Sequence, residues 1–146
     1  MTEEALYPIS EAEQLVQGFL SCQLAKGEFS HEAHLIAALY LLAKYGDNTL
    51  PVIRQHLLDY LSSIGVENND TSGYHETMTV FWLWRLKKRF ADKDGQVLWN
   101  QENIDELVED FEMTERNIWL EHYSKELMTS IAARKHFVEP DIKPLK

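Results

Sequence analysis

The sequence predicts an all-α protein: one compact domain, residues 1–146, of about six helices followed by an extended C-terminal tail. Three observations support this fold class. Apolar residues recur at the three- and four-residue spacing of a helix face, helix caps and breakers separate these stretches, and no segment alternates apolar and polar residues as a half-buried strand does. With 45% hydrophobic residues the chain can form a core, and a domain of this length buries roughly 70% of its unfolded surface.

A first helix is predicted between residues 10 and 27. Ser10 and Glu13 have the spacing of a capping box, in which two side chains satisfy two backbone N–H groups at the helix start. An apolar stripe follows and continues until Gly27, which ends the helix: Leu15, Val16, Phe19, Leu20 and Leu24.

The second and third helices are also bounded by cap residues and glycines. Ser30 caps the second helix, which extends to Gly46 and is apolar on most of its sides. The third begins at Asn48 or Thr49 and ends at Gly65. A proline near its first turn agrees with this start, because the first N–H groups of a helix have no partner within the helix.

The second half of the chain continues the helical pattern. A polar loop, VENNDTSG, leads into the helix YHETMTVFWLWRLKKRF (residues 74–90). Asn103 with Glu106 repeats the capping pattern, a further helix covers residues 118–120, and Ser124 caps the last helix, KELMTSIAARKHF. The tail VEPDIKPLK contains two prolines and is therefore expected to be extended.

Charge and composition exclude several classes of partner. The net charge of −10 opposes general nucleic-acid binding, which needs cations that neutralise phosphates. The basic run RLKKRF lies near a helix end, where cations complement the helix dipole, and is interpreted as a solvated terminus. No apolar run approaches the roughly 20 residues of a membrane span, and MTEEALYPIS lacks the features of a signal peptide. We therefore expect a cytoplasmic protein that binds neither nucleic acid nor membranes, with its single cysteine, Cys22, in the core.

Three histidines lie near helix starts, on faces that are otherwise apolar. His31 and His34 share a face with apolar residues of the second helix, and His75 shares one with Thr79 and Trp82. The positive end of the helix dipole disfavours imidazolium, so these rings are expected to stay neutral. Neutral imidazole is the form that binds metals or accepts a proton.

The last predicted helix carries an arginine on its apolar face. Arg134 aligns with Leu127, Ser130 and Ile131. Such a side chain must reach solvent or meet an anionic group. Asp141, in the stiff PDIKP segment, is the nearest partner in sequence, with carboxylates beside the histidines as alternatives. We predict a contact of Arg134 with Asp141 or with a bound anion.

Three blocks, FSHEAHL, GYHETMT and HYSKELMTSIAARKHFVEPDIKPL, together resemble a family of small, uncharacterised, all-helical bacterial proteins. The family pattern is F-x-H-x-x-H, then Y-H-x-T-x-T, then Y-S-x-x-L-x-x-S-x-x-A-R with P-D-x-x-P-L, and the resemblance covers Phe29 to Leu145. One departure is Lys125, where the resemblance implies proline, and it concerns capping more than a site. The resemblance supplies positions and no activity: Phe29, His31, His34, Tyr74, His75, Thr77, Thr79, Tyr123, Ser124, Ser130, Arg134, Pro140 and Asp141.

The first functional hypothesis is a metal site. His31, His34 and His75 would bind a divalent metal, zinc or ferrous iron, with an open position for hydrolase- or oxygenase-like chemistry. The HEAH segment is one residue shorter than the zincin motif H-E-x-x-H, so the zincin mechanism is not implied. The hypothesis predicts that the three rings converge in one polar cavity.

The second hypothesis is a metal-free pocket for a small-molecule or anionic ligand. Arg134 would bind a carboxylate or phosphate, and a histidine would act as general base. Hydroxyl groups of Tyr123, Thr79 and Ser130 would orient the ligand, with Asp141 close by. Tyr123 and Arg134 would close the cavity, and the PDIKPL segment would cross them.

A third hypothesis is structural: the histidines and the arginine form a satisfied hydrogen-bond network in a non-catalytic structural or interaction protein. An exposed Trp84 would then point to the surface of a homodimer.

Overall fold

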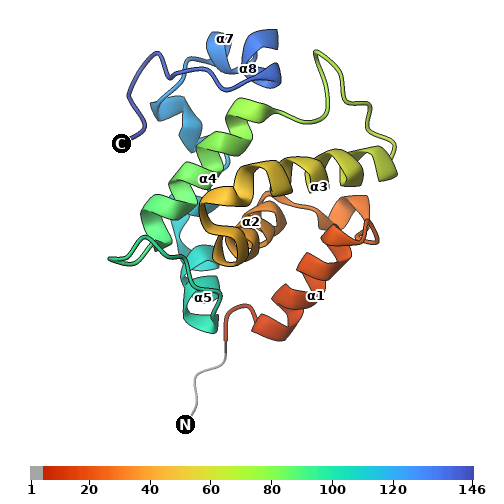
Figure 1. The fold of residues 1–146 in the computed structure, drawn as a ribbon, viewed down its shortest axis with the longest axis vertical. Helices are drawn as coiled ribbons and strands as arrows, with labels where there is room; N and C mark the ends of the chain where they lie inside the picture. The colour runs from red at the N-terminus through yellow and green to blue at the C-terminus, as the bar shows by residue number, and fades with distance from the viewer. Residues whose placement is uncertain (1–4) are drawn as a thin grey trace.

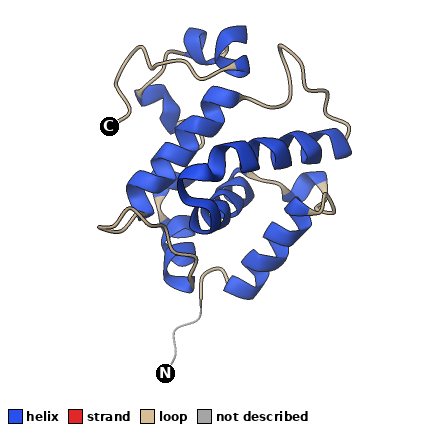
Figure 2. Cartoon of the chain, viewed as in Figure 1, coloured by secondary structure: helices blue, strands red, loops and turns tan. Residues whose placement is uncertain are grey.

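The computed structural model describes residues 5–146 of the chain. These residues form eight α-helices and three 3-10 helices, without a strand among them (Figure 2). The all-α prediction is thereby confirmed. The α-helices are α1 (Ile9–Leu20), α2 (His31–Tyr45), α3 (Thr49–Ser63), α4 (Glu76–Phe90), α5 (Gln101–Glu109), α6 (Phe111–Thr114), α7 (Lys125–Met128) and α8 (Ile131–Lys135). The 3-10 helices are η1 (Lys26–Glu28), η2 (Gly46–Asn48) and η3 (Ile118–Glu121).

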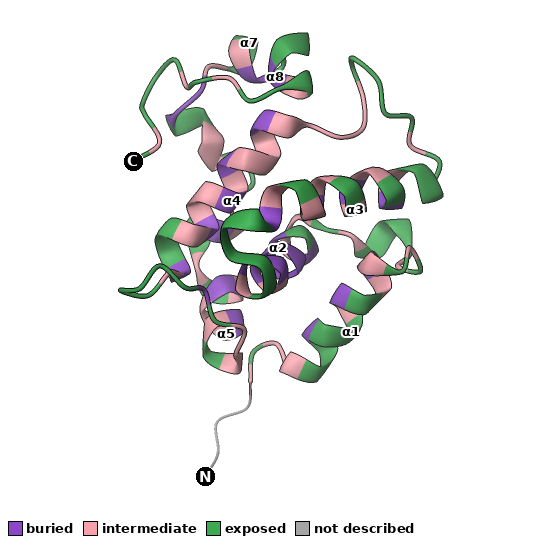
Figure 3. Ribbon diagram, viewed as in Figure 1, coloured by how far each residue is buried: buried purple, intermediate pink, exposed green. Residues whose placement is uncertain are grey.

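The central helix of the fold is α2, and α1, α3, α4 and α5 pack around it (Figure 1). Its buried residues include a continuous run, Leu35 to Leu39, so the helix is enclosed on most sides and not along one stripe (Figure 3). Burying each leucine side chain contributes about 1.5–3 kcal/mol before the entropy of ordering is subtracted. A helix enclosed in this way fixes the position of the two histidines in its first turn.

A second, smaller core lies between α4 and the C-terminal segments. Its buried members are Phe81, Tyr123 and Met128, and Trp84 packs against them. Trp84 is therefore half-buried and is not the exposed aromatic that would mark a dimer surface. Over residues 5–146, no helix has the length and apolar character that crossing a bilayer requires.

The first helix differs from its prediction at both ends. It starts at Ile9, Pro8 is the N-cap residue, and no side chain caps it, so Ser10 does not form the expected box with Glu13. It ends at Leu20, well before Gly27, because the Ser21 hydroxyl donates to the Gln17 carbonyl at 2.7 Å and Cys22 adopts a left-handed φ of 58°. These local backbone alternatives stop the helix without a glycine.

Caps elsewhere agree with the sequence in part. The Ser30 side chain accepts a hydrogen bond from the Ala33 N–H at 3.2 Å, as predicted for α2. Gly46 and Gly65 adopt φ of 56° and 82° after α2 and α3, the conformation that glycine reaches without strain. The α5 prediction is wrong in register: Asn100 is the N-cap and accepts from the Asn103 N–H at 2.8 Å.

The predicted last helix is broken into α7 and α8. Ser124 caps α7 as expected, but Ser130 has an extended backbone, ψ 155°, and caps α8 by accepting from the Ala133 N–H. A second N-cap only five residues after α7 begins restarts the helix instead of continuing it. The extended tail then returns along α4, where the Thr77 hydroxyl donates to the His136 carbonyl and accepts from the Val138 N–H.

Candidate functional site

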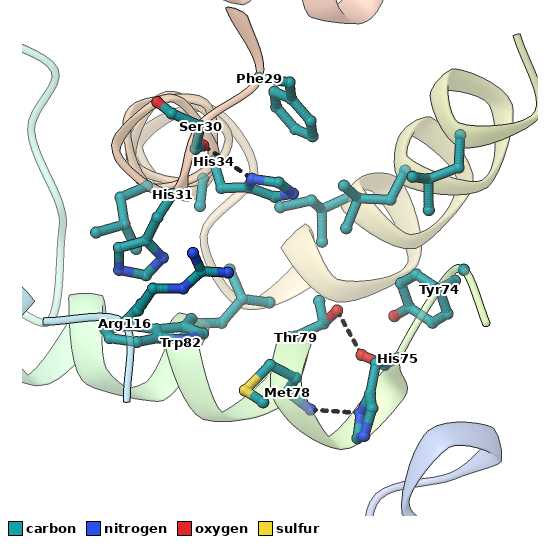
Figure 4. Close-up of a pocket in the computed structure, with 17 residues that line it drawn as sticks. Phe29, Ser30, His31, His34, Tyr74, His75, Met78, Thr79, Trp82 and Arg116 are labelled. Atoms are coloured by element: carbon teal, nitrogen blue, oxygen red, sulfur yellow. Dashed lines mark hydrogen bonds between the residues drawn. The ribbon is translucent and has the colours of Figure 1, made fainter. Parts of the chain in front are cut away.

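A cavity of about 430 Å³ opens among α2, α3, α4 and the segment that follows α6 (Figure 4). This volume lies in the range of about 300–1,000 Å³ that is usual for small-molecule sites. Its walls are mainly apolar and include Leu35, Ile53, Leu57, Met78 and Trp82. All three predicted histidines line it, and so does Thr79.

His34 presents a free ring nitrogen to this cavity. Its Nδ1 lies 3.0 Å from the Ser30 carbonyl oxygen, which can only accept, so Nδ1 carries the proton and donates. The other nitrogen, Nε2, is unprotonated and points toward the middle of the cavity (Figure 4). Phe29 holds the ring in place, with its ring centroid 3.7 Å from that of the imidazole.

The electrostatic surroundings keep His34 neutral. His34 is an exposed residue of the cavity lining, and Phe29 packs against its ring. Desolvation by the protein atoms around the ring lowers the pKa of His34, and the nearby His31 and Arg116 lower the pKa further. At neutral pH, Nε2 is therefore a hydrogen-bond acceptor.

His31 has the opposite tautomer. Its Nε2 lies 3.0 Å from the Met113 carbonyl oxygen, so Nε2 donates and Nδ1 retains a lone pair. Trp82 packs edge-on against the ring, with centroids 4.7 Å apart. Burial lowers the pKa of His31. Every buried side-chain nitrogen and oxygen in the described part of the chain has a hydrogen-bond partner, so the partnerless nitrogens are ones that solvent reaches.

His75 lines the cavity but has both ring nitrogens engaged. It is the N-cap residue of α4: Nδ1 accepts from the Met78 N–H at 3.1 Å, and Nε2 donates to the Met128 carbonyl at 2.7 Å. Burial lowers the pKa of His75. Figure 4 shows its ring directed away from His31 and His34. The structure thus brings the three histidines to one cavity, but only two of them offer it a nitrogen.

Arg116 is a site residue that the sequence analysis missed. It follows α6, lines the cavity, and extends its guanidinium group toward the space between His31 and Thr79 (Figure 4). None of the ion pairs within residues 5–146 includes it. Its sequence context, TERN, has no apolar periodicity that would give the side chain a direction, so the signal was absent.

The far end of the cavity is formed by Tyr74 and Thr79. The Tyr74 hydroxyl donates to the Glu76 carboxylate at 2.5 Å, and burial, followed by this contact, raises the pKa of Tyr74 well above its usual range. Glu76 is only 12% exposed and is neutralised by a two-pronged contact with Arg54. Thr79 donates to the His75 carbonyl at 2.8 Å and keeps its oxygen lone pairs. This end is therefore polar without being charged.

Four predicted site residues lie outside the cavity lining. Tyr123 is fully buried and donates to the Val138 carbonyl at 2.8 Å, and Ser130 caps α8. Asp141 accepts from the Ser124 N–H at 2.7 Å. Arg134 donates to the Gly73 carbonyl at 2.8 Å and to the next carbonyl along the chain at 3.3 Å, so the expected Arg134–Asp141 contact is wrong. Backbone carbonyls, which carry no sequence signal, take the place of the carboxylate.

A metal centre would need ligands beyond these histidines. Across residues 5–146, no group of three or more histidine, cysteine, aspartate and glutamate side chains is arranged to hold a metal ion. His31 and His34 would supply two ligands, whereas catalytic zinc sites typically use three protein ligands. His75 would have to give up the cap of α4 to become the third.

Comparison with protein-family models, curated proteins and solved structures gives no match for this chain. The chemistry of the cavity therefore carries the functional argument.

Proposed function

We propose that this protein binds a small organic anion with an apolar body in the cavity between α2, α3 and α4, without a metal ion. The observation that carries the proposal is the Arg116 guanidinium, the one formal charge among the described residues that line the cavity. A carboxylate or phosphate would form charge-assisted hydrogen bonds with it.

The charge balance of the cavity supports an anion over a cation. Arg54 neutralises Glu76 behind the Tyr74 wall, and desolvation keeps His31 and His34 uncharged at neutral pH. Among the described lining residues the remaining formal charge is the positive one of Arg116, and the nearby carboxylate that acts on His31, Glu115, lies outside the lining. An anionic ligand in the cavity would therefore be attracted to this arginine.

The apolar walls support a ligand with a hydrocarbon or aromatic body. Leu35, Leu57, Met78 and Trp82 would cover it, and each buried methylene contributes about 0.8 kcal/mol. A mostly apolar pocket with a few convergent polar groups is the usual form of a small-molecule site. In such a complex the lowered pKa of His34 makes the ring a hydrogen-bond acceptor for the ligand and a weak general base.

Calorimetry with paired probes tests the proposal. Phenylacetate and octanoate should bind more tightly than their uncharged amides. Arg116→Gln should weaken binding of both acids about tenfold or more, since a hydrogen bond to a charged group contributes about 1.5–3 kcal/mol. Arg116→Lys should retain part of the affinity.

Arg89→Gln is the matched control, because it removes the same charge from a surface arginine that pairs with Glu106 and Asp110 outside the cavity. Acid binding by the Arg116→Gln variant at wild-type affinity, or equal binding of acids and amides, would refute the proposal. Binding that chelators abolish would instead favour the metal hypothesis.

A further inference from the structure

We infer that the ligand carries a hydrogen-bond donor, such as a hydroxyl group, in addition to its acidic group, and that His34 selects for this donor. The inference deepens the proposed function and rests on it. It names the ligand class as hydroxy acids or phenolic acids of about a dozen non-hydrogen atoms.

The side chains of α2 and α4 face the cavity with free hydrogen-bond acceptors. His34 Nε2 can only accept, because the ring proton is held on Nδ1 by the Ser30 carbonyl. His31 Nδ1 can only accept, because Nε2–H is held by the Met113 carbonyl. The Thr79 hydroxyl donates its hydrogen to the His75 carbonyl, so toward the cavity this hydroxyl can only accept.

The cavity lining also contains donors. They are the Arg116 guanidinium, the Trp82 indole N–H and the Ser30 hydroxyl, whereas both nitrogens of His75 are engaged and the Tyr74 proton is held by Glu76. No group among the described residues donates to His34 Nε2 or to His31 Nδ1. Both acceptors are therefore left for water or for a ligand.

A ligand that displaces water from this cavity must replace the hydrogen bonds that water donates. A plain carboxylate satisfies Arg116 but donates nothing, so it leaves His34 Nε2 without a partner, and an unpaired acceptor in a confined site weakens binding. A hydroxyl group restores that bond. Sites that hydrogen-bond a ligand hydroxyl discriminate against the analogue that lacks it for this reason.

His34 is the acceptor best placed to make this selection. Its free ring nitrogen points to the middle of the cavity, whereas the His31 ring lies against Trp82 at the wall (Figure 4). Its orientation is fixed on two sides, by the Ser30 hydrogen bond and by Phe29. A fixed acceptor distinguishes ligands better than a mobile one, because no ordering cost falls on binding.

Matched acids that differ by one hydroxyl group test the inference by calorimetry. The pairs are mandelate with phenylacetate, and 3- and 4-hydroxybenzoate with benzoate, so that the hydroxyl group is offered at different distances from the carboxylate. In the wild type, at least one hydroxy acid should bind about three- to tenfold more tightly than its partner, the worth of one ordinary hydrogen bond.

The advantage should vanish in His34→Leu and persist in part in His34→Gln, whose side-chain oxygen can still accept. Arg116→Gln should weaken both members of a pair equally and leave their ratio unchanged. In wild-type protein with 15N-labelled histidine, the Nε2 resonance of His34 should move on adding the preferred hydroxy acid and stay in place on adding its deoxy partner.

The two proposals fail in different ways. No binding of any acid refutes the proposed function and this inference with it. Tight binding of all the acids, with a hydroxyl ratio near one in the wild type or a ratio that survives His34→Leu, leaves the proposed function intact and refutes the role of His34. The wild-type ratio and the labelled-histidine spectrum keep the test decisive even if His34→Leu fails to fold.

Discussion

Replacing His75 should destabilise the protein through two hydrogen bonds that its ring makes at once. The ring caps α4 by accepting from the Met78 N–H, and it joins α4 to α7 by donating to the Met128 carbonyl. Losing an N-cap costs about 1 kcal/mol. Leaving the carbonyl of Met128, a residue only 1% exposed, without a donor costs about 1–3 kcal/mol more. His75→Ala should therefore lower the free energy of unfolding by about 2–4 kcal/mol.

A second variant separates the two contributions. Asparagine is a good N-cap, but its short side chain cannot also reach Met128, so His75→Asn should restore about 1 kcal/mol relative to His75→Ala. Urea denaturation followed by circular dichroism at pH 7.5 gives both values. His136→Ala is the control, because this exposed histidine makes its hydrogen bonds through backbone groups alone, and it should stay within about 0.5 kcal/mol of the wild type.

If His75→Ala unfolds at the wild-type midpoint, neither hydrogen bond contributes to stability and the prediction is wrong. If His75→Asn is as unstable as His75→Ala, the N-cap contributes nothing and the whole loss comes from the hydrogen bond to Met128.

Two further predictions concern stability. Desolvation lowers the pKa of His31, His34 and His75, so the unfolded chain binds their protons near pH 6.5 while the folded chain does not. Their contribution to stability is therefore constant above that pH and falls below it. The fall should reach at most about 1.4 kcal/mol per pH unit for each of the three between pH 6.5 and 5.5, and His75→Asn should make the slope shallower. A flat denaturation midpoint across this range would contradict the prediction. Arg134→Ala should lower the free energy of unfolding by about 1–3 kcal/mol, because two backbone carbonyls before α4 lose their donor. The control Lys135→Ala breaks an exposed ion pair with Asp70 and should cost less than about 1 kcal/mol. Equal effects of the two substitutions would exclude the role of Arg134 as donor to these carbonyls.

The helical periodicity of the sequence predicted the fold class and the enclosed central helix, because hydrophobic spacing is a local signal. The same periodicity predicted that His31, His34 and His75 line one cavity, because each lies near a helix start and shares a face with apolar residues. Helix ends were less predictable. The first helix ends where Ser21 and Cys22 adopt a local alternative, and the last is split at Ser130, and both depend on side chains competing for backbone groups.

The roles of the three histidines could not be predicted from spacing. Whether an imidazole coordinates, accepts or caps depends on which backbone groups meet its two nitrogens. Met113 and Met128 supply carbonyls from segments 82 and 53 residues away in the chain, to His31 and His75. Such contacts leave no trace in local sequence, since every residue has a carbonyl oxygen.

Helical periodicity also failed to predict which arginine lines the cavity. Arg134 stood out in the sequence because it lies on an apolar helix face, and the structure explains that placement by the carbonyls of Gly73 and Tyr74, which it binds. Arg116 had no helix face to mark it, yet it lines the cavity beside His31 and His34. Arg134 is a poor anion receptor because its donors bind backbone carbonyls, whereas Arg116 is exposed at the cavity and keeps its donors for a ligand. The proposed anion site therefore uses the arginine that local periodicity could not select. Comparing the two substitutions separates the roles: Arg134→Gln should change stability more than acid binding, and Arg116→Gln should change acid binding more than stability.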